Sequence, residues 1–278
     1  MAASAADNPV STTAYWTLAA RYEDASRERP VANDTFAARF MDDTARTVAQ
    51  RFSALKRPFA SFPVRHRVID DLLRGVLERD PTRRIVVLGC GFDTRAFRLG
   101  GGHWLEVDEP ELLAIKDARL PVTEAPNDLV RIAIRFRTES LEATLIPYAT
   151  TGPVAIVLEG VFGYLPDTDR RVLLTALARL FPRQVLLCDL LTRTFLARYA
   201  RGLVRSLRAM DAEFAASSDH PEALLHELGY ATHTKISIPA KAVDLRAPGA
   251  PPSWLLPLLP GFRDGYCVWA FSLRHTTL

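Results

Sequence analysis

The segment VVLGCGFDTRAFRL, residues 86–99, places two glycines directly after a run of aliphatic residues. Gly89 and Gly91 lack a β-carbon, so their backbone can approach a ligand closely. In an open α/β sheet, a turn of this kind lies at the carboxyl edge of the strands, where ligands bind. The glycine turn therefore predicts a binding site, and neighbouring residues must specify the ligand.

Two common nucleotide motifs do not fit this turn. A nucleoside triphosphate site needs the pattern GxxxxGK[ST], and no Gly-Lys pair occurs in the chain. A dinucleotide site needs a third glycine for close helix packing, but Gly91 is followed by Phe92, Asp93 and Thr94. The missing glycine disfavours a nicotinamide oxidoreductase, which remains an alternative interpretation.

Two carboxylates indicate which ligand the turn accommodates. Asp108 ends the segment HWLEVD, 17 positions after Gly91, where an acid can accept both hydroxyls of a ribose. Asp93 favours the sulfonium of S-adenosylmethionine over a pyrophosphate, because a carboxylate attracts a cation and repels an anion. Arg95 partly offsets that charge. We predict S-adenosylmethionine as the cofactor; a plain tight turn with Asp108 as a helix cap is the alternative.

The elements that must position these residues follow from the apolar pattern. Short apolar runs alternate with amphipathic stretches, and this alternation predicts parallel strands joined by crossover helices, an α/β Rossmann-like doubly wound sheet. We expect strands at 83–89, 103–108, 129–136, 153–160 and 183–191, and helices at 64–79, 110–119 and 167–181. A helix closed by Gly229 and two further strands, at 230–238 and 266–274, complete seven strands. Because no convincing crossover helix precedes it, the last strand should run antiparallel.

The remaining segments predict helices around the sheet. Residues 1–60 have helical spacing and form an N-terminal helical cover, and residues 61–278 form the cofactor-binding domain. Residues 192–218 are amphipathic, rich in Arg and Ala, and longer than an ordinary connection, so we expect a helical lid there. An acceptor pocket should lie between the sheet edge, the cover and the lid.

Composition excludes several classes of partner. The 278 residues are 48% hydrophobic and carry a net charge of +3 with no basic block, which indicates a globular protein that does not bind nucleic acid. Three separated cysteines lack metal-ligand spacing and indicate reduced thiols without a metal site. No apolar run reaches the roughly 18 residues of a membrane span, and the N-terminus lacks a secretory pattern. We expect a cytoplasmic protein that is not bound to a membrane.

Five blocks, in the same order, resemble the leucine carboxyl methyltransferase family. The segment at 86–99 resembles its first motif, a hydrophobic strand followed by GAGLDTRAxRL. LAARYEDA (18–25), VRHRVIDD (64–71), LEVDEPELLAIK (105–116) and VLEGVFGYL (157–165) resemble its RAxE, RTxxxD, EVDxPxxxxxK and EGxxxYL motifs. The resemblance implies S-adenosylmethionine-dependent enzymes that methylate the C-terminal carboxylate of protein phosphatases, or O-methylate polyketides and other small metabolites.

The resemblance also implies a role for each matching position. Arg65 would pair with the methionine carboxylate of the cofactor, for which a planar guanidinium is well suited. Asp108 would hold the ribose, Glu159 would lie near the methionine amino group, and Tyr164 would face the acceptor. The expected cofactor-binding residues are Arg65, Gly89, Gly91, Asp93, Asp108, Phe136 and Glu159.

One position departs from the family pattern. After the third strand, the family usually has an aspartate that accepts a hydrogen bond from adenine, followed by leucine; this chain has Arg135 and Phe136. Arginine cannot accept that bond. We expect Phe136 and Glu139 to recognise adenine through stacking and a shifted carboxylate. Reduced cofactor affinity and a non-catalytic member of the family are the alternatives.

Transfer of a methyl group from a sulfonium is an in-line displacement, so alignment and exclusion of water matter most, and no metal is required. None of the six histidines has a partner visible in the sequence, and no base is assigned. Tyr164, Arg21 and Tyr22 are the candidates on the acceptor side. The sequence predicts an O-methyltransferase acting on a carboxylate or hydroxyl of a small metabolite, including polyketides; a protein C-terminal carboxyl methyltransferase is the alternative.

Overall fold

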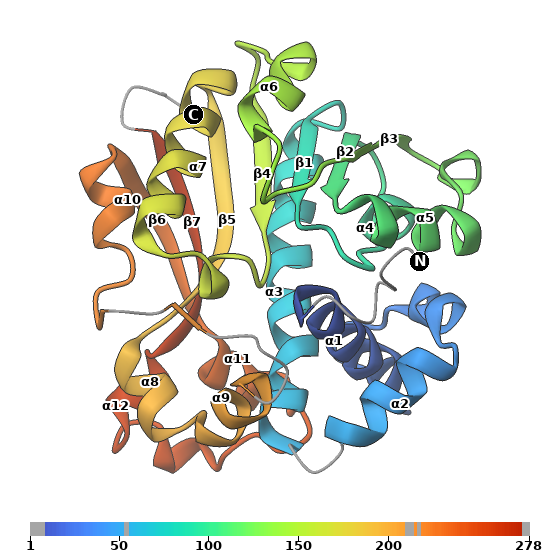
Figure 1. Ribbon diagram of the computed structural model, residues 1–278. Coiled ribbons are helices and arrows are strands. Elements are labelled where there is room, and N and C mark those ends of the chain that lie inside the picture. Colours follow the sequence, from blue (N-terminus) through green and yellow to red (C-terminus); the bar gives the residue numbers. More distant parts are fainter. Residues whose placement is uncertain (1–8, 53–55, 209–213, 216–217, 274–278) are drawn as a thin grey trace.

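A computed structural model describes residues 9–52, 56–208, 214–215 and 218–273, which form one mixed sheet (Figure 1). Its strand order is β3-β2-β1-β4-β5-β7-β6. The first five strands are parallel, and β7 lies antiparallel between β5 and β6. The predicted α/β class, the seven strands and the antiparallel last strand are confirmed. The strands are β1 (Arg84–Leu88), β2 (His103–Asp108), β3 (Asp128–Ala133), β4 (Val154–Leu158), β5 (Gln184–Leu191), β6 (Tyr230–Ser237) and β7 (Tyr266–Leu273).

Helices cover both faces of the sheet because successive strand residues point to opposite sides. Ile85 and Val87 of β1 pack in one core and Val86 and Leu88 in the other. The first core includes residues of α3 (Lys56–Arg79), α4 (Arg95–Arg98) and α5 (Pro110–Arg119). The second includes residues of α6 (Leu141–Leu145), α7 (Asp167–Leu180) and α10 (Ala223–Glu227). Single-turn helices are η3 (Val122–Glu124), η4 (Ile146–Tyr148) and η5 (Phe162–Tyr164).

The N-terminal cover comprises α1 (Pro9–Ala25), η2 (Thr35–Phe40) and α2 (Asp43–Phe52), and it packs beside α3 (Figure 1). The helix expected from residue 64 begins at Lys56 and contains Pro63. Pro58 lies in its first turn, where a missing N–H costs little. The boundary expected between residues 60 and 61 therefore lies within α3, so the cover and the sheet domain share one helix.

The helices at the lower left of Figure 1 come from the C-terminal half of the chain. The segment after β5 forms α8 (Arg193–Arg198) and α9 (Arg201–Arg208), within the expected lid. Residues 209–213 and 216–217 of that lid lie outside the described residues. Between β6 and β7 lie α11 (Ile238–Asp244), η6 (Ser253–Leu255) and α12 (Pro260–Arg263), and α12 contacts α8. The direction of β7 is as predicted, but the reason given, the lack of a crossover helix, was incomplete, since helices do connect β6 to β7.

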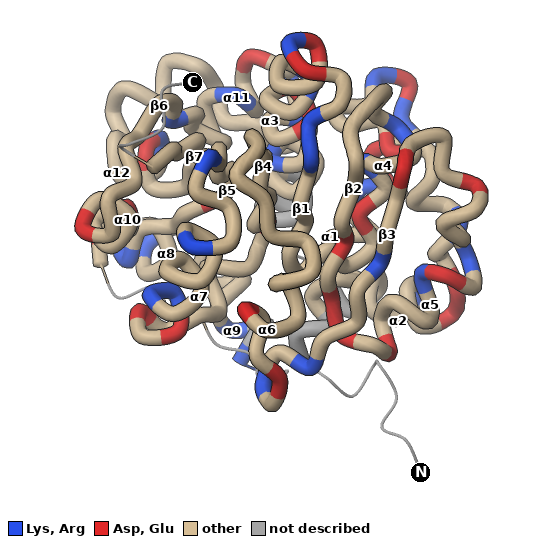
Figure 2. Tube along the Cα trace, turned by 90° about the horizontal axis from the view of Figure 1, so that it is seen from above, with Lys and Arg blue, Asp and Glu red and all other residues tan. Residues whose placement is uncertain are grey.

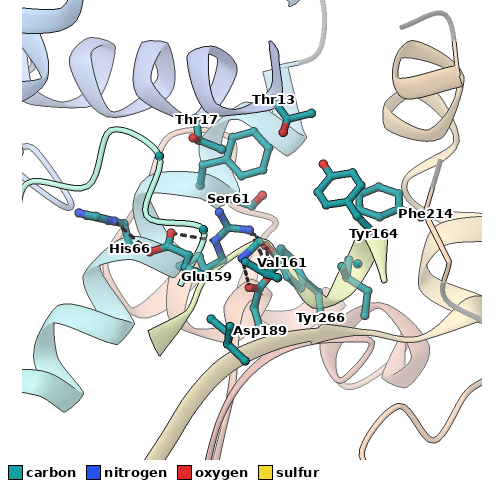
Figure 3. A pocket seen from close by; sticks show the side chains of 18 of the residues that line it. Thr13, Thr17, Ser61, His66, Glu159, Val161, Tyr164, Asp189, Phe214 and Tyr266 are labelled. Carbon is teal, nitrogen blue, oxygen red and sulfur yellow. Dashed lines mark hydrogen bonds and ion pairs between the residues drawn. The ribbon is translucent and has the colours of Figure 1, made fainter. Parts of the chain in front are cut away.

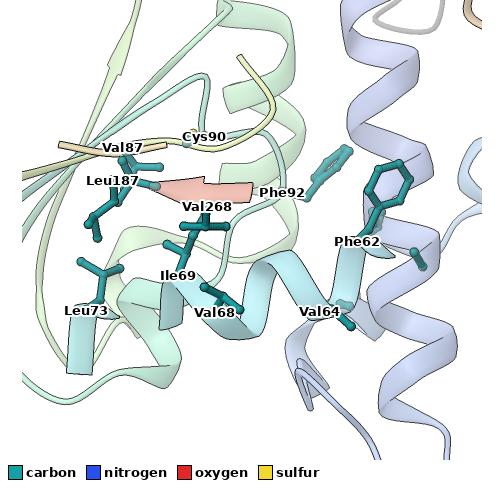
Figure 4. Packing of buried hydrophobic residues seen from close by; sticks show 14 of the residues in the cluster. Phe62, Val64, Val68, Ile69, Leu73, Val87, Cys90, Phe92, Leu187 and Val268 are labelled. Atoms are coloured by element: carbon teal, nitrogen blue, oxygen red, sulfur yellow. The ribbon is translucent and has the colours of Figure 1, made fainter. Parts of the chain in front are cut away.

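The core on the α3 face joins the cover to the sheet. Val68, Ile69 and Leu73 of α3 lie against Val87, Leu187 and Val268 of the sheet (Figure 4). Toward the start of the helix, Phe62 packs edge-on against Trp16 of α1. No described helix combines the length and apolarity needed to span a bilayer. Viewed from above, basic and acidic residues are interspersed along the chain (Figure 2).

Ile69→Ala tests this core. Ile69 has no exposed surface, so its truncation should leave a cavity and lower the free energy of unfolding by about 2–4 kcal/mol. The matched control is Val172→Ala on α7, where the side chain is 71% exposed and a change within about 0.5 kcal/mol is expected. Urea denaturation measures both; equal effects would contradict the packing.

Candidate active site

A cavity of about 1390 Å³ lies at the carboxyl ends of β1, β2, β4 and β5. The cover lines it on one side and the lid on the other, with Thr13, Tyr164 and Phe214 among its walls (Figure 3). Pockets for one small ligand are typically about 300–1,000 Å³. This cavity is large enough for a cofactor together with an acceptor.

The glycine turn forms one wall of this cavity. Gly89 and Gly91 have φ values of +64° and +50°, a conformation that favours glycine. A β-carbon on Gly89 would lie 2.8 Å from Cγ2 of Val161. The N–H of Gly89 donates to the carbonyl of Val107 on the neighbouring strand. The turn therefore presents backbone to the cavity, as the sequence predicted.

Asp108 lies at the end of β2 and lines the same wall. One carboxylate oxygen accepts the N–H of Gly91 at 2.6 Å, and the other accepts the N–H of Glu109 at 2.7 Å. Burial raises the pKa of this carboxyl, because the residue is only 7% exposed. A carboxylate has about four acceptor positions, so two remain for hydroxyl donors from a ligand.

Arg95 is fully buried behind the glycine turn and holds three carboxylates. Its Nε donates to Asp70 at 2.6 Å, its Nη1 donates to Asp93, and its Nη2 donates to Glu159 at 2.7 Å. Asp93 also accepts the backbone N–H of Arg95 at 2.7 Å. Arg95 therefore offsets the charge of Asp93 only in part, because it shares one positive charge among three carboxylates.

The ion pairs continue into the cover. Arg98 pairs with Asp70 at 2.7 Å and with Asp34 at 3.4 Å. Arg21 of α1 pairs with Asp34 at 2.5 Å and donates to the carbonyl of Phe92, beside the glycine turn, at 3.0 Å. Arg21 lines the cavity, but these bonds tie α1 to the turn. Its role as an acceptor-side residue stays a prediction.

Tyr22 does not reach this cavity. Arg21 and Tyr22 are adjacent on α1, so their side chains point in different directions. Tyr22 is 40% exposed and lines a separate, smaller hollow together with Glu23 and Arg27. The structure therefore does not bring Tyr22 together with the other candidates.

His66 is buried between the arginines. Its Nε2 lies 2.6 Å from Nη2 of Arg98, and its Nδ1 lies 3.2 Å from the Glu159 carboxylate. Burial, and then the Arg95 guanidinium, lower its pKa. Nδ1 also lies 2.7 Å from Nη2 of Arg95, and a neutral ring can accept a hydrogen bond from only one of these two arginines.

Arg65 lies at the centre of the cavity wall. Its Nε donates to Glu159, and its Nη1 donates to Asp189 and to the hydroxyl of Tyr266, each at 3.0 Å. Glu159, Asp189 and Tyr266 converge in Figure 3. Asp189 also accepts the N–H of Gly160 at 2.6 Å. The expected Arg65 and Glu159 are thus brought together as an opposite-charge pair.

Sequence reasoning missed Asp189 and Tyr266. Asp189 is the one charged residue within VLLCDLL, a run that otherwise suits a buried strand, and this was the available signal. Tyr266 begins β7, and only the sheet topology brings it beside β5, where it faces Leu191 across the ladder.

Tyr164 lies between the cover and the lid. Its ring stacks on Phe214 with centroids 5.2 Å apart, and the N–H of Ala215 donates to the carbonyl of Gly163 at 2.8 Å. Burial raises the pKa of Tyr164 to about 12. The phenol is therefore neutral at pH 7 and is not a base in its resting state.

The loop after β3 contributes Phe136 to the cavity. Phe136 is 41% exposed, and its N–H donates to Glu109 at 3.2 Å. Arg135 pairs with Glu111 at 2.9 Å and does not line the cavity. Glu139 lines it and accepts the N–H of Arg135 at 3.0 Å. Arg135, which replaces the family's acid, therefore does not place its guanidinium group in the cavity wall.

Lys116 contacts the glycine turn through Cys90. It is fully buried and pairs with Glu106 at 2.8 Å, and its Nζ lies 3.6 Å from Sγ of Cys90. Burial raises the pKa of the Cys90 thiol, so the thiol stays protonated. Within the described ranges, no group of His, Cys, Asp and Glu side chains is arranged to hold a metal ion.

Comparisons with known proteins agree with this geometry. The family model "Leucine carboxyl methyltransferase" matches residues 14–178. A "Putative S-adenosyl-L-methionine-dependent methyltransferase" of Mycolicibacterium paratuberculosis is 32% identical over 177 residues, 56% of this chain and 58% of that protein. The chain spans about half the length of several curated relatives it matches.

Two further proteins are similar over more of the chain. "Tetracenomycin polyketide synthesis O-methyltransferase TcmP" of Streptomyces glaucescens is 26% identical over 221 residues, 77% of each protein. The crystal structure of a "putative methyltransferase" from Thermobifida fusca YX has a TM-score of 0.60 at 17% identity, over 86% of this chain and 92% of that one. This structure has the same fold.

Asp70→Asn tests the buried ion pairs. Burial alone would raise the pKa of Asp70, but His66, Arg95 and Arg98 together hold it well below its usual range. The ion pairs of Asp70 therefore stabilise the folded protein fully above the pKa of this carboxyl in the unfolded chain, about 4. This stabilisation is lost as the pH falls through the lower pKa that Asp70 has in the folded protein. At pH 7 we expect the variant to lose about 3–5 kcal/mol, because two guanidinium contacts lose their charge partner.

Below about pH 4, wild type should lose stability more steeply than Asp70→Asn, since only wild type must protonate this carboxylate. Asp43→Asn is the control, because Asp43 is fully exposed and pairs only with Arg46 at 2.9 Å. Denaturant unfolding between pH 3 and pH 7 measures both variants. Parallel curves for wild type and Asp70→Asn would rule out the proposed coupling.

Proposed function

The chain belongs to the leucine carboxyl methyltransferase family, and from this membership we propose that it is an S-adenosylmethionine-dependent O-methyltransferase for a small-molecule acceptor. The observation that carries the proposal is the single cavity, which joins the glycine turn and Asp108 to an apolar space under the lid. The similarity to the tetracenomycin enzyme supports a polyketide-like acceptor.

The residues around the turn fit the proposed cofactor. Gly89 and Gly91 line the cavity, and Asp108 has acceptor positions for the two ribose hydroxyls. Phe136 offers a ring face for adenine. Arg65 and Glu159 lie 3.0 Å apart and present opposite charges to the cavity, which suits the carboxylate and ammonium of an amino-acid tail.

When bound, S-adenosylmethionine supplies an electrophilic methyl group on a positively charged sulfur. The chain's contribution is to fix both partners in line and to exclude water. Tyr164 and Phe214 close the cavity between η5 and the lid, and Thr13 of α1 faces them (Figure 3). Arg95 keeps the turn and Glu159 in fixed positions through its three ion pairs.

The protonation states favour an acceptor oxygen that is already ionised. His66 has a lowered pKa and both ring nitrogens face partners, while the Tyr164 phenol titrates only near pH 12. The carboxylates of Glu159 and Asp189 are held by Arg65. A carboxylate or an acidic phenol needs no general base at pH 7, so either class suits this site.

A protein C-terminus is a less well supported acceptor. The contacts of Phe214 and Ala215 with η5 cover the cavity, whereas a peptide tail needs an open cleft.

Asp108→Ala tests the cofactor assignment. Removing the carboxylate should weaken binding of S-adenosylhomocysteine about 10- to 100-fold, because ribose hydroxyls lose a charged acceptor, worth roughly 1.5–3 kcal/mol. Asp128→Ala is the control, since Asp128 is exposed on the adjacent strand and pairs with His103. Isothermal titration calorimetry measures both, and NAD serves as a competing ligand. Binding of NAD alone, or unchanged affinity in Asp108→Ala, would refute the assignment.

A further inference from the structure

The part of the cavity formed by the helices that follow β5 and β6 has an aromatic and aliphatic lining. We call it the acceptor chamber, and define it by Phe195, Tyr199, Leu203, Ile238, Leu259 and Phe262. The ring of Phe195 stacks near that of Phe262 at 5.9 Å, and Tyr199 meets Phe262 edge-on at 5.2 Å. These rings form a continuous apolar wall that suits a flat, apolar molecule.

One cation lies on the lining of this chamber. Arg198 ends α8, is exposed to solvent and lines the cavity. Within the described residues it makes no hydrogen bond or ion pair. Arg21 and Arg65 line the cavity as well, but Arg21 is paired with Asp34, and Arg65 lies beside Glu159, where we place the amino-acid tail of the cofactor. Arg137 also has no ion pair among the described residues, but it comes from the loop after β3 and not from the helices around the chamber.

Among the described residues of the helices around Arg198, no carboxylate lines the cavity. The acidic side chains of the lining come from the glycine turn, β2, β4, β5, α6, α7 and the loops beside β2 and β3. Among the described residues of α8, α9, α11, η6 and α12, none contributes an acid to the wall. The chamber therefore combines an apolar surface with an uncompensated positive charge, which attracts anions.

We propose that Arg198 is a specificity-determining residue that binds an anionic group of the acceptor, and that the acceptor is a planar aromatic acid. That this aromatic acid is the molecule to be methylated rests on the proposed function. The anionic group is distinct from the methylated oxygen, because α8 belongs to the lid whereas the cofactor-binding residues come from the sheet edge. A planar guanidinium can bind a carboxylate through two parallel hydrogen bonds.

The chain offers a matched control for a merely solvated arginine. Arg201 begins α9, is exposed, and does not line the cavity. Its Nε donates to the carbonyl of Ala197 at 2.6 Å. Replacing Arg201 removes the same positive charge from the lid without touching the chamber, so any general effect of net charge appears in both variants.

The test compares two ligands that differ only in the anionic group. 3-Hydroxy-2-naphthoate and 2-naphthol are titrated into wild type, Arg198→Ala, Arg198→Lys and Arg201→Ala, with and without saturating S-adenosylhomocysteine. We expect wild type to prefer the naphthoate and Arg198→Ala to lose that preference, with affinity for the naphthoate about tenfold lower. Affinity for 2-naphthol should stay the same in all four proteins, and Arg198→Lys should retain part of the preference.

Equal affinity of wild type for the two ligands, no binding of either, or equal losses in Arg198→Ala and Arg201→Ala would overturn the proposal. Binding of S-adenosylhomocysteine is measured separately in each protein and should not change. If wild type fails to bind S-adenosylhomocysteine, the proposed function fails, and the titrations without it still decide the role of Arg198.

Discussion

The guanidinium of Arg95 is the interaction on which the site depends. It is fully buried and bonds Asp70 of α3, Asp93 of the glycine turn and Glu159 after β4. Removing one partner of such a group leaves an uncompensated buried charge, which is strongly destabilising. The three segments must therefore meet in one geometry, and the glycine turn and Glu159 face the cavity from fixed positions.

The same chain of ion pairs reaches the elements that close the cavity. Through Asp70, Arg98 and Asp34 it continues to Arg21, so the cover is joined to the back of the turn. On the other side, Glu159 connects it to Arg65, and Arg65 to β5 and β7. The cover is therefore part of the cavity wall, and α3 is continuous through both regions.

Local patterns in the sequence predicted much of the fold and part of the site. Strand runs, the glycine turn, the cap at Gly229 and the acid at Asp108 are local signals, and the structure has them within a few residues. The partners of a buried charge are not local. Asp93 and Arg95 are neighbours in the sequence, but nothing near Arg95 shows its contacts with Asp70 and Glu159, and the separation of Asp189 from Arg65 hides their contact. Tyr22 lines a separate, smaller hollow, and the sequence alone does not show which residues of α1 meet the main cavity.

A crystal structure with S-adenosylhomocysteine tests the central claim most directly. The account predicts the thioether against Gly89 and Gly91, the ribose hydroxyls on Asp108, and the bonds of Arg95 to Asp70, Asp93 and Glu159 unchanged from the free protein. A ligand bound elsewhere, or a site that forms only after Arg95 releases Asp93 or Glu159, would contradict it.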